Sequence, residues 1–169
     1  PMSFGVYIHI PYCLQRCTYC DFATYEQSQI MPPDQYLQLL FEEIRQTRKA
    51  YPQGRLSTVY FGGGTPSLLP AEHIVSILAG LAKYGFTTGP DDRGNNPGAK
   101  TEVTIEINPA TISEKKMELF LGAGINRFSV GAQTFNDALL KSVHREHDAQ
   151  QTRDTLKLLK SYGVNFSFD

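Results

Sequence analysis

Strand-like and helix-like apolar patterns alternate along nearly the whole chain. At 6–10 and 103–107 every second residue is apolar, which is the period of a β-strand. At 36–44 and 74–81 the apolar residues fall three and four positions apart, the period of an amphipathic helix. A strand followed by a helix, repeated four times, predicts an α/β fold whose strands form a parallel sheet with right-handed crossovers.

Turn and capping residues set the expected limits of these elements. Helices should begin around Pro32, Pro33 and Asp34, at Pro70 and after Ser113, and Gly85 predicts a left-handed helix end. The segment 86–100 is rich in Gly, Pro, Asn and Asp and predicts a surface loop. Strands are expected near 6–10, 58–61, 103–107, 128–130 and 164–168, with further helices over about 136–143 and from there to 162.

Polar residues follow several of the expected strands. Gly62 to Thr65, Glu106 and Asp169 fall at carboxyl ends of strands, where both doubly wound sheets and (β/α) barrels carry their chemistry. This placement predicts a site but does not choose between the two folds. The chain stops on a strand without a covering helix, so we expect a partial barrel, truncated after its fifth strand.

Composition narrows the classes of function. The 169 residues fit one domain, and 16 basic against 17 acidic residues give a formal charge of -1, which does not favour nucleic acid as a partner. Apolar runs are shorter than the ~20 residues of a membrane span. The start lacks a signal-peptide pattern, and we therefore expect a cytoplasmic protein.

Three cysteines, Cys13, Cys17 and Cys20, lie within eight residues after the first strand. An odd, clustered set in a cytoplasmic chain indicates metal ligation rather than disulfides. Three thiolates can hold an iron–sulfur cluster and leave one iron open to substrate. Two alternatives stay open: a zinc site with His9 as fourth ligand, and three buried cysteines without a metal.

Two further motifs have both a functional and an ordinary interpretation. The run Gly62-Gly63-Gly64-Thr65-Pro66-Ser67 allows close backbone approach, and its free N–H and C=O groups could grip an amino-acid moiety; it could also be a tight turn. Glu106 interrupts an apolar strand, which is unfavourable inside a barrel unless the carboxylate is paired, although it could instead face solvent.

The string Tyr7-Ile-His-Ile-Pro-Tyr-Cys13-x3-Cys17-x2-Cys20 resembles the radical S-adenosylmethionine (SAM) superfamily. It is most similar to the oxygen-independent coproporphyrinogen III oxidase group and its haem-chaperone relatives of the HemW type, over essentially the whole chain. The resemblance implies a partial TIM-like barrel in which 1–169 form the N-terminal part of the radical SAM core. It also implies a [4Fe–4S] cluster on the three cysteines, with SAM chelating the fourth iron and accepting one electron to give methionine and a 5′-deoxyadenosyl radical.

The same resemblance implies the SAM contacts. Gly63, Gly64 and Thr65 belong to a GGGTP segment that contacts the methionyl amino group, and Arg145 faces a SAM carboxylate. The other positions that match SAM- or cluster-flanking residues of the family are Tyr7, Tyr19, Glu106, Gln133 and Asp169.

One position distinguishes the branches of the family. The oxidase pattern carries a fourth cysteine two residues after the third, and here that position is Phe22. We therefore favour a haem chaperone, which would bind haem, pass it to acceptor proteins and draw on an electron-donor protein. The alternative is a radical enzyme that decarboxylates coproporphyrinogen III to protoporphyrinogen IX, so whether the chain is an enzyme stays open.

Overall fold

The computed structural model describes residues 3–52, 55–86 and 100–169. Five strands form one parallel sheet: β1 (Ser3–Ile10), β4 (Arg55–Gly63), β5 (Glu102–Ile107), β6 (Arg127–Val130) and β7 (Asn165–Phe168). A second, two-stranded pairing joins β2 (Tyr12–Cys13) to β3 (Tyr25–Glu26). The helices are α1 (Pro33–Ala50), α2 (Ala71–Lys83), α3 (Glu114–Ala123), α4 (Asp137–Ser142) and α5 (Ala149–Ser161), with short 3₁₀ helices at Gln27–Gln29, Pro66–Leu68 and Pro109–Thr111.

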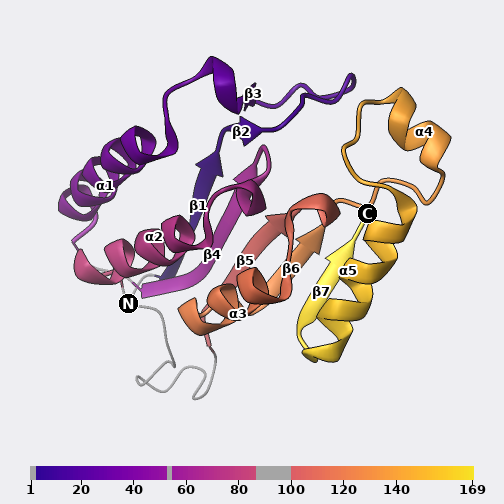
Figure 1. Cartoon of the computed structure of the whole chain (residues 1–169). Coiled ribbons are helices and arrows are strands. Elements are labelled where there is room, and N and C mark those ends of the chain that lie inside the picture. Colours follow the sequence, from indigo (N-terminus) through magenta and orange to yellow (C-terminus); the bar gives the residue numbers. More distant parts are fainter. Residues whose placement is uncertain (1–2, 53–54, 87–99) are drawn as a thin grey trace.

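The order of the strands in space follows their order in the chain, β1-β4-β5-β6-β7. A doubly wound sheet reverses direction at a switch point, whereas a barrel adds each strand beside the last. Consecutive helices also pack on one another, α1 on α2 and α2 on α3, along one side of the curved sheet (Figure 1). Both observations identify the fold as a partial (β/α) barrel, as expected.

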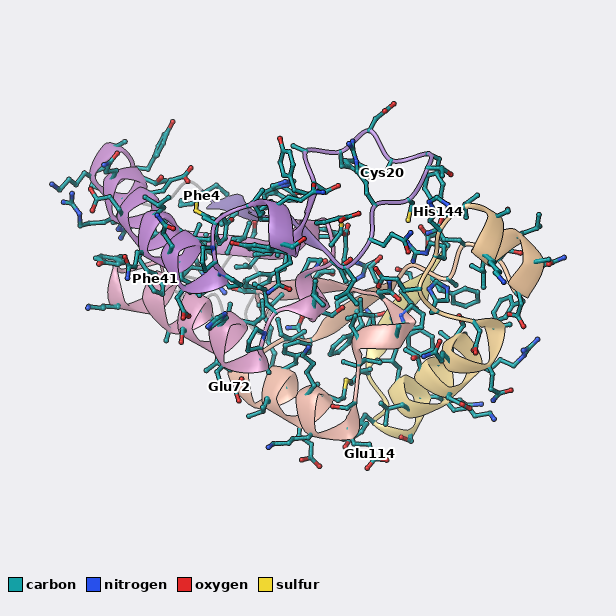
Figure 2. All side chains as sticks on the ribbon, turned by 45° about the horizontal axis from the view of Figure 1, so that its top comes forward. Phe4, Cys20, Phe41, Glu72, Glu114 and His144 are labelled. Atoms are coloured by element: carbon teal, nitrogen blue, oxygen red, sulfur yellow. The ribbon has the colours of Figure 1, made fainter. Side chains whose placement is uncertain are left out.

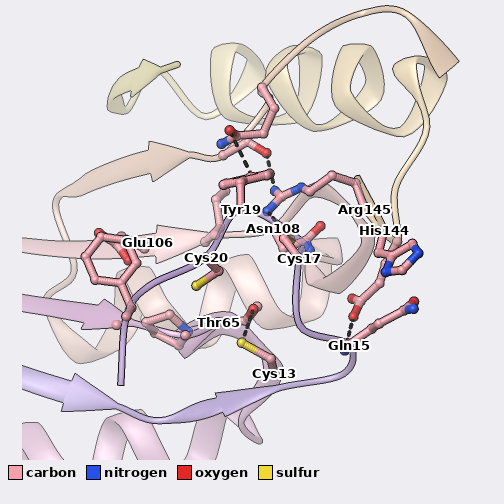
Figure 3. Close-up of a pocket in the computed structure, with 18 of the residues that line it drawn as sticks. Cys13, Gln15, Cys17, Tyr19, Cys20, Thr65, Glu106, Asn108, His144 and Arg145 are labelled. Carbon is pink, nitrogen blue, oxygen red and sulfur yellow. Dashed lines mark hydrogen bonds between the residues drawn. The ribbon is translucent and has the colours of Figure 1, made fainter. Parts of the chain in front are cut away.

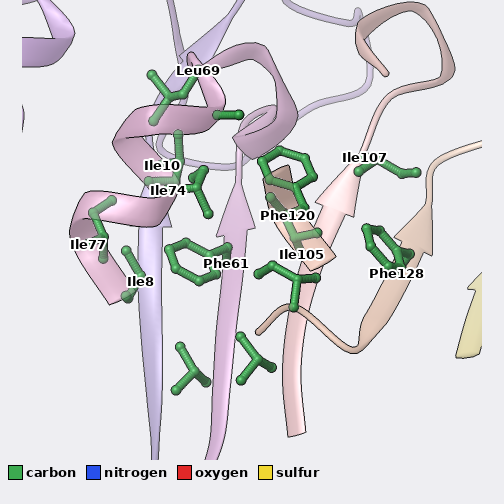
Figure 4. Close-up of a cluster of buried hydrophobic side chains, with 14 of the residues drawn as sticks. Ile8, Ile10, Phe61, Leu69, Ile74, Ile77, Ile105, Ile107, Phe120 and Phe128 are labelled. Atoms are coloured by element: carbon green, nitrogen blue, oxygen red, sulfur yellow. The ribbon is translucent and has the colours of Figure 1, made fainter. Parts of the chain in front are cut away.

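The hydrophobic core lies between the sheet and these helices (Figure 4). Phe61, Ile105 and Phe128 of neighbouring strands are fully buried there, together with Ile77 of α2 and Phe120 of α3. The alternate residues of the strands face the other side of the sheet. Because successive strand side chains point to opposite faces, that inner side carries the polar residues.

Several predicted limits are confirmed. Gly85 has a φ of +82°, as a left-handed helix end requires, and Ser113 caps α3 by accepting from the N–H of Lys116. The second strand is longer than predicted, since it continues through Gly62 and Gly63. The reason is that both glycines pair in register with β1, which periodicity within β4 cannot reveal.

The predicted loop 86–100 falls mostly outside the described residues, which resume at Lys100. Phe86, its first residue, is buried and packs edge-to-face on Phe4 of β1, with ring centroids 5.9 Å apart. Among the helices that the structure describes, none is both long and apolar enough to cross a membrane.

Candidate functional site

A cavity of about 330 Å³ opens at the carboxyl ends of the sheet strands (Figure 3). Its walls come from the cysteine loop, the glycine run, the ends of β5 and β6, and the segment between α4 and α5. Eleven of the twelve predicted site residues line it: Cys13, Cys17, Tyr19, Cys20, Gly63, Gly64, Thr65, Glu106, Gln133, Arg145 and Asp169. The carboxyl ends of parallel strands meet at one edge of a barrel, so residues far apart in sequence converge here.

All three cysteines are free thiols, and Cys13 is the most buried of them. Each sulfur has polar neighbours: Thr65 Oγ1 lies 4.0 Å from Cys13 Sγ, Thr24 Oγ1 lies 3.6 Å from Cys20 Sγ, and an Arg145 nitrogen donates to Cys17 Sγ at 3.7 Å. Burial raises the pKa of the Cys13 thiol. Three sulfurs with polar neighbours in one cavity fit the ligand set of an iron–sulfur cluster with an open iron.

His9 does not serve as a fourth ligand beside the cysteines. Its Nε2 donates to the carbonyl of Ala23 at 2.8 Å, and its Nδ1 accepts from the Tyr7 hydroxyl at 3.0 Å, so both ring nitrogens are engaged. The engaged nitrogens of His9 speak against the zinc alternative.

Tyr7 is the one predicted residue that does not line the cavity. It stands on the inner side of the sheet, where its ring stacks on Tyr60 with centroids 6.1 Å apart. More than half of its side chain is exposed.

The glycine run is held more tightly than expected. Gly64 donates its N–H to the carbonyl of Ile10 at 2.7 Å, and Thr65 donates to that of Tyr12 at 2.8 Å. The N–H of Gly63 is bonded to the Glu106 carboxylate. The expectation of free N–H groups is therefore wrong for Gly63 and Gly64, because the run is hydrogen-bonded to β1, to β2 and to β5. Carbonyl oxygens, with two lone pairs each, remain suited to an amine.

Gly64 is needed for close packing rather than for an unusual φ. A Cβ at this position would lie 2.5 Å from the carbonyl oxygen of Tyr12 and 3.0 Å from Cys13 Sγ. The absence of a side chain at Gly64 is thus what lets the glycine run approach the first cysteine.

Glu106 points into the cavity from β5 and is largely shielded from solvent. Its Oε1 accepts from the hydroxyl of Tyr60 at 2.8 Å. Burial raises the pKa of Glu106, and the negative charge of Asp169 adds to that shift. Burial and the carboxylate together raise the pKa of Tyr60 to about 12, so the phenol stays a donor at neutral pH. The solvent-facing alternative for Glu106 is wrong.

A chain of polar contacts crosses the cavity from the cysteine loop to β7. The hydroxyl of Tyr19 donates to the side-chain oxygen of Gln133 at 3.1 Å, and the Gln133 amide lies 3.4 Å from the Asp169 carboxylate. The backbone N–H of Gln133 also donates to the carbonyl of Asp169, at 2.8 Å. Gln133 has a φ of +64°, and among the described residues only it and His144, with +59°, are non-glycine residues at positive φ. Both line the cavity, as strained residues at binding sites often do.

Arg145 reaches the cavity from the segment between α4 and α5. One guanidinium nitrogen donates to the carbonyl of Gly131 at 2.7 Å while another approaches Cys17. Its Nε is buried and has no partner among the described residues. A cation held in this way is suited to a carboxylate. The nearby His147 is buried against the carbonyl of Ala132, at 3.1 Å, and does not point to a metal site.

The sequence analysis missed several contributors, among them Tyr60, Thr24, Gln15 and Glu146. Tyr60 could have been found from the alternation of side chains along a strand. It lies two residues before Gly62, so both face the same side of the sheet. Glu146 could not, since its partner Gln15 is 131 positions away in the chain.

The fold and the cavity define a (β/α) barrel protein with three thiols at the carboxyl ends of its strands. A profile of the radical SAM superfamily matches residues 7–168, and the chain belongs to that superfamily. Within it, the chain is 36% identical over 172 residues to the protein called Heme chaperone HemW from Escherichia coli, covering 100% of this chain and 42% of the relative. It is 32% identical to the Heme chaperone HemW of Buchnera aphidicola, covering 98% of this chain and 41% of that protein.

A vertebrate relative and a solved structure agree with this assignment. Radical S-adenosyl methionine domain-containing protein 1, mitochondrial, from Danio rerio is 34% identical over 90% of this chain and 32% of its own length. Coproporphyrinogen III oxidase (HemN) from Escherichia coli, described as a radical SAM enzyme, superposes with a TM-score of 0.86 at 26% identity, over 99% of this chain and 36% of that one. The chain spans about two fifths of the length of the HemW relatives it matches.

Proposed function

We propose that residues 1–169 are the N-terminal part of the radical SAM core of a haem chaperone, which binds a [4Fe–4S] cluster and SAM. The observation that carries the proposal is that three free thiols, the partly buried guanidinium of Arg145 and the partly buried carboxylate of Glu106 line one cavity. Similarity to HemW proteins supports the haem-chaperone branch.

Each residue of the cavity has a role that its chemistry suits. Cys13, Cys17 and Cys20 would ligate three irons, and a bound, reduced cluster supplies one electron at an iron that stays open to SAM. Arg145 would orient the SAM carboxylate through its guanidinium. Glu106, held by Tyr60, would accept from the SAM amine.

The remaining predicted contacts complete the binding of SAM. Carbonyls of the segment 63–65 would accept from the amine as well. Tyr19, Gln133 and Asp169 already form a hydrogen-bonded wall and would close the cavity around the nucleoside. Tyr7 would contact the ligand from the inner side of the sheet, where it stacks on Tyr60.

Phe22 supports haem delivery over decarboxylation. The side chain is 69% exposed and lines the cavity at the position where the oxidase pattern has a fourth cysteine. The second candidate, coproporphyrinogen III decarboxylation, draws on the structural likeness to HemN. Haem or a porphyrinogen, an electron-donor protein and, for a chaperone, haem-accepting proteins would be the partners, in the cytoplasm, where thiols stay reduced.

Anaerobic reconstitution of the purified protein tests the cluster and SAM. We expect about four irons and four sulfides per chain and an electron paramagnetic resonance signal that SAM perturbs. Cys17→Ser should lose iron, and Arg145→Met should keep the cluster but weaken the response to SAM. The matched control is Arg45→Met, because Arg45 lies partly exposed on α1, away from the cavity, and its salt bridge among the described residues is with Glu42. Zinc in place of iron, or a signal indifferent to SAM, would refute the proposal.

A haem titration and a product assay then separate the two branches. Stoichiometric haem binding with transfer to an apo-haemoprotein supports the chaperone. Formation of protoporphyrinogen IX from coproporphyrinogen III, with SAM consumed, would establish the enzyme instead.

A further inference from the structure

The segment between α4 and α5, residues 143–148, lies against the cysteine loop, residues 14–19. Figure 2 shows the two neighbouring at the open end of the barrel, where His144 and Cys20 are labelled. The strongest contact is the N–H of Gln15, which donates to the Glu146 Oε1 at 2.6 Å. The two residues are 131 positions apart in the chain, so this bond forms only when these distant segments come together in the folded protein.

Two weaker contacts join the same segments. The N–H of Thr18 donates to the carbonyl of Val143 at 3.4 Å, near the limit of a hydrogen bond. Arg145 meets Cys17 through sulfur, a weak acceptor, at 3.7 Å. A short bond to a carboxylate is stronger than either.

The base of this segment is rigid. Asp148 caps α5 by accepting from the N–H of Gln151 at 2.7 Å, and the Gln151 side chain bonds back to Asp148. The N–H of Ala149 donates to Asp137 of α4 at 2.8 Å. The segment that carries Glu146 is therefore fixed at its end by hydrogen bonds to α4 and α5.

Folding stability alone does not account for Glu146. Its second oxygen, Oε2, is buried and has no hydrogen-bond partner among the residues that the structure describes. Burying an unpaired carboxylate oxygen is unfavourable. A feature that costs stability beside a binding cavity indicates a positioning role.

We propose that Glu146 is a positioning residue that fixes the main chain between Cys13 and Cys17 and so sets the placement of these two thiols before any cofactor binds. It acts through Gln15 and touches neither thiol. The inference rests on the proposed function only in treating the thiols as cluster ligands.

Amide hydrogen exchange in the protein without cluster tests the contact directly. In Glu146→Ala the N–H of Gln15 should exchange roughly tenfold faster or more, because a charge-assisted bond is lost. Glu146→Gln keeps an acceptor at the same reach and should stay near the original rate. The matched control is Glu118→Ala, since Glu118 also accepts one side-chain bond, from Tyr162, but lies on α3 away from the cavity.

The global stability separates positioning from a structural role. Glu146→Ala removes the unpaired oxygen, so its urea midpoint should stay the same or rise while the protection of Gln15 falls. Should Glu146→Ala not fold, Glu146→Asp decides, because the shorter side chain keeps the charge but should not reach Gln15. The proposal would be overturned if the exchange rate of the Gln15 N–H were unchanged in the Ala or Asp variant. It would also be overturned if Glu146→Gln lost as much protection at Gln15 as Glu146→Ala.

The reconstituted protein gives a second readout. Iron should be lost from Glu146→Ala roughly fivefold faster or more under a chelator, and Glu146→Gln should restore most of the retention. Equal rates of iron loss in the Ala variant and the unsubstituted protein would contradict the effect on the thiols. Failure of every variant to take up a cluster would count against the proposed function alone, since exchange at Gln15 is measured without it.

Discussion

Glu106 illustrates how a binding residue can lower stability. It is held by Tyr60 and by the N–H of Gly63, yet burial and the nearby Asp169 still raise its pKa. The hydrogen bonds favour the charged form, but they do not offset the loss of water around it. Burial of the Glu106 carboxylate in the cavity therefore lowers the folding stability of the charged form.

Replacing Glu106 by Gln should stabilise the protein at neutral pH. A carboxyl whose pKa is higher when folded than when unfolded contributes stability below its unfolded pKa, about 4.3, and this contribution is lost as pH rises through the folded pKa. The advantage of the variant should thus be largest at pH 7 and shrink towards pH 4. Urea unfolding across this pH range measures it, and a variant less stable at pH 7 would contradict the expectation. The same variant should bind SAM more weakly.

A methyl group at Gly64 should disturb the first cysteine. In Gly64→Ala the new Cβ would overlap the Tyr12 carbonyl and crowd Cys13 Sγ, so we expect a large loss of reconstituted iron. The matched control is Gly122→Ala on α3, where a Cβ would meet nothing within 4 Å. That control should keep its iron and gain about 0.5–1 kcal/mol in unfolding free energy. Full iron content in Gly64→Ala would show that the cysteine loop can shift without loss.

Among the elements, α5 matters for the site because its N-cap, Asp148, lies two residues after Glu146 and three after Arg145. Its capping box, formed by Asp148 and Gln151, fixes where the helix starts. The cap therefore sets the orientation of residues 143–148, which lie before the helix and contact the cysteine loop.

Removing this cap should cost stability and loosen the site together. Asp148→Ala should lower the unfolding free energy by about 1 kcal/mol, whereas Asp148→Asn, which keeps an acceptor, should lose much less. Urea denaturation gives the first value, and amide exchange at Gln15 reports whether the cysteine loop loosens as well. Equal stabilities of the Ala and Asn variants would mean that the side-chain bond to Gln151 contributes little.

In the whole molecule, one side of the sheet provides the stability of the fold and the other side provides the binding residues. The side under the helices is apolar and closed, and the inner side carries Tyr60, Glu106 and other polar groups. Packing on the first side holds the strands in the register that aligns the second. Stability and binding are thus set by alternate residues of the same strands.

Phe61→Ala should destabilise the chain by about 3–5 kcal/mol, because Phe61 is fully buried on the second strand of the sheet. That loss is a large part of the total stability of an ordinary domain. Leu39→Ala, at a half-exposed position of α1, should change it by less than about 0.5 kcal/mol. Thermal or urea unfolding measures both, and similar effects would mean that the buried side of the sheet is not the main core.

Most elements of the fold follow from local pattern. Residues such as Ile8 and Ile10, or Ile74 and Ile77, repeat at the spacing that puts them on one side of a strand or helix, and all four are buried. The second strand shows the limit of this approach. Its glycines carry no pattern of their own, and only pairing with β1 makes them part of the strand.

The amino-acid sequence alone determined the parallel α/β class, the three-thiol loop and the polar strand ends, because each depends on chain neighbours and on burial of one side of an element. The pattern of elements did not give the order of the strands in space, so the placement of polar strand ends fitted a doubly wound sheet as well as the expected partial barrel. The strand order in the sheet decides for the barrel. The sequence could also not predict that the N–H groups of the glycine run are hydrogen-bonded, or that Gln15 and Glu146 are in contact. These features depend on which distant segments pack together, and that is settled by many weak contacts across the folded chain rather than by any spacing along it.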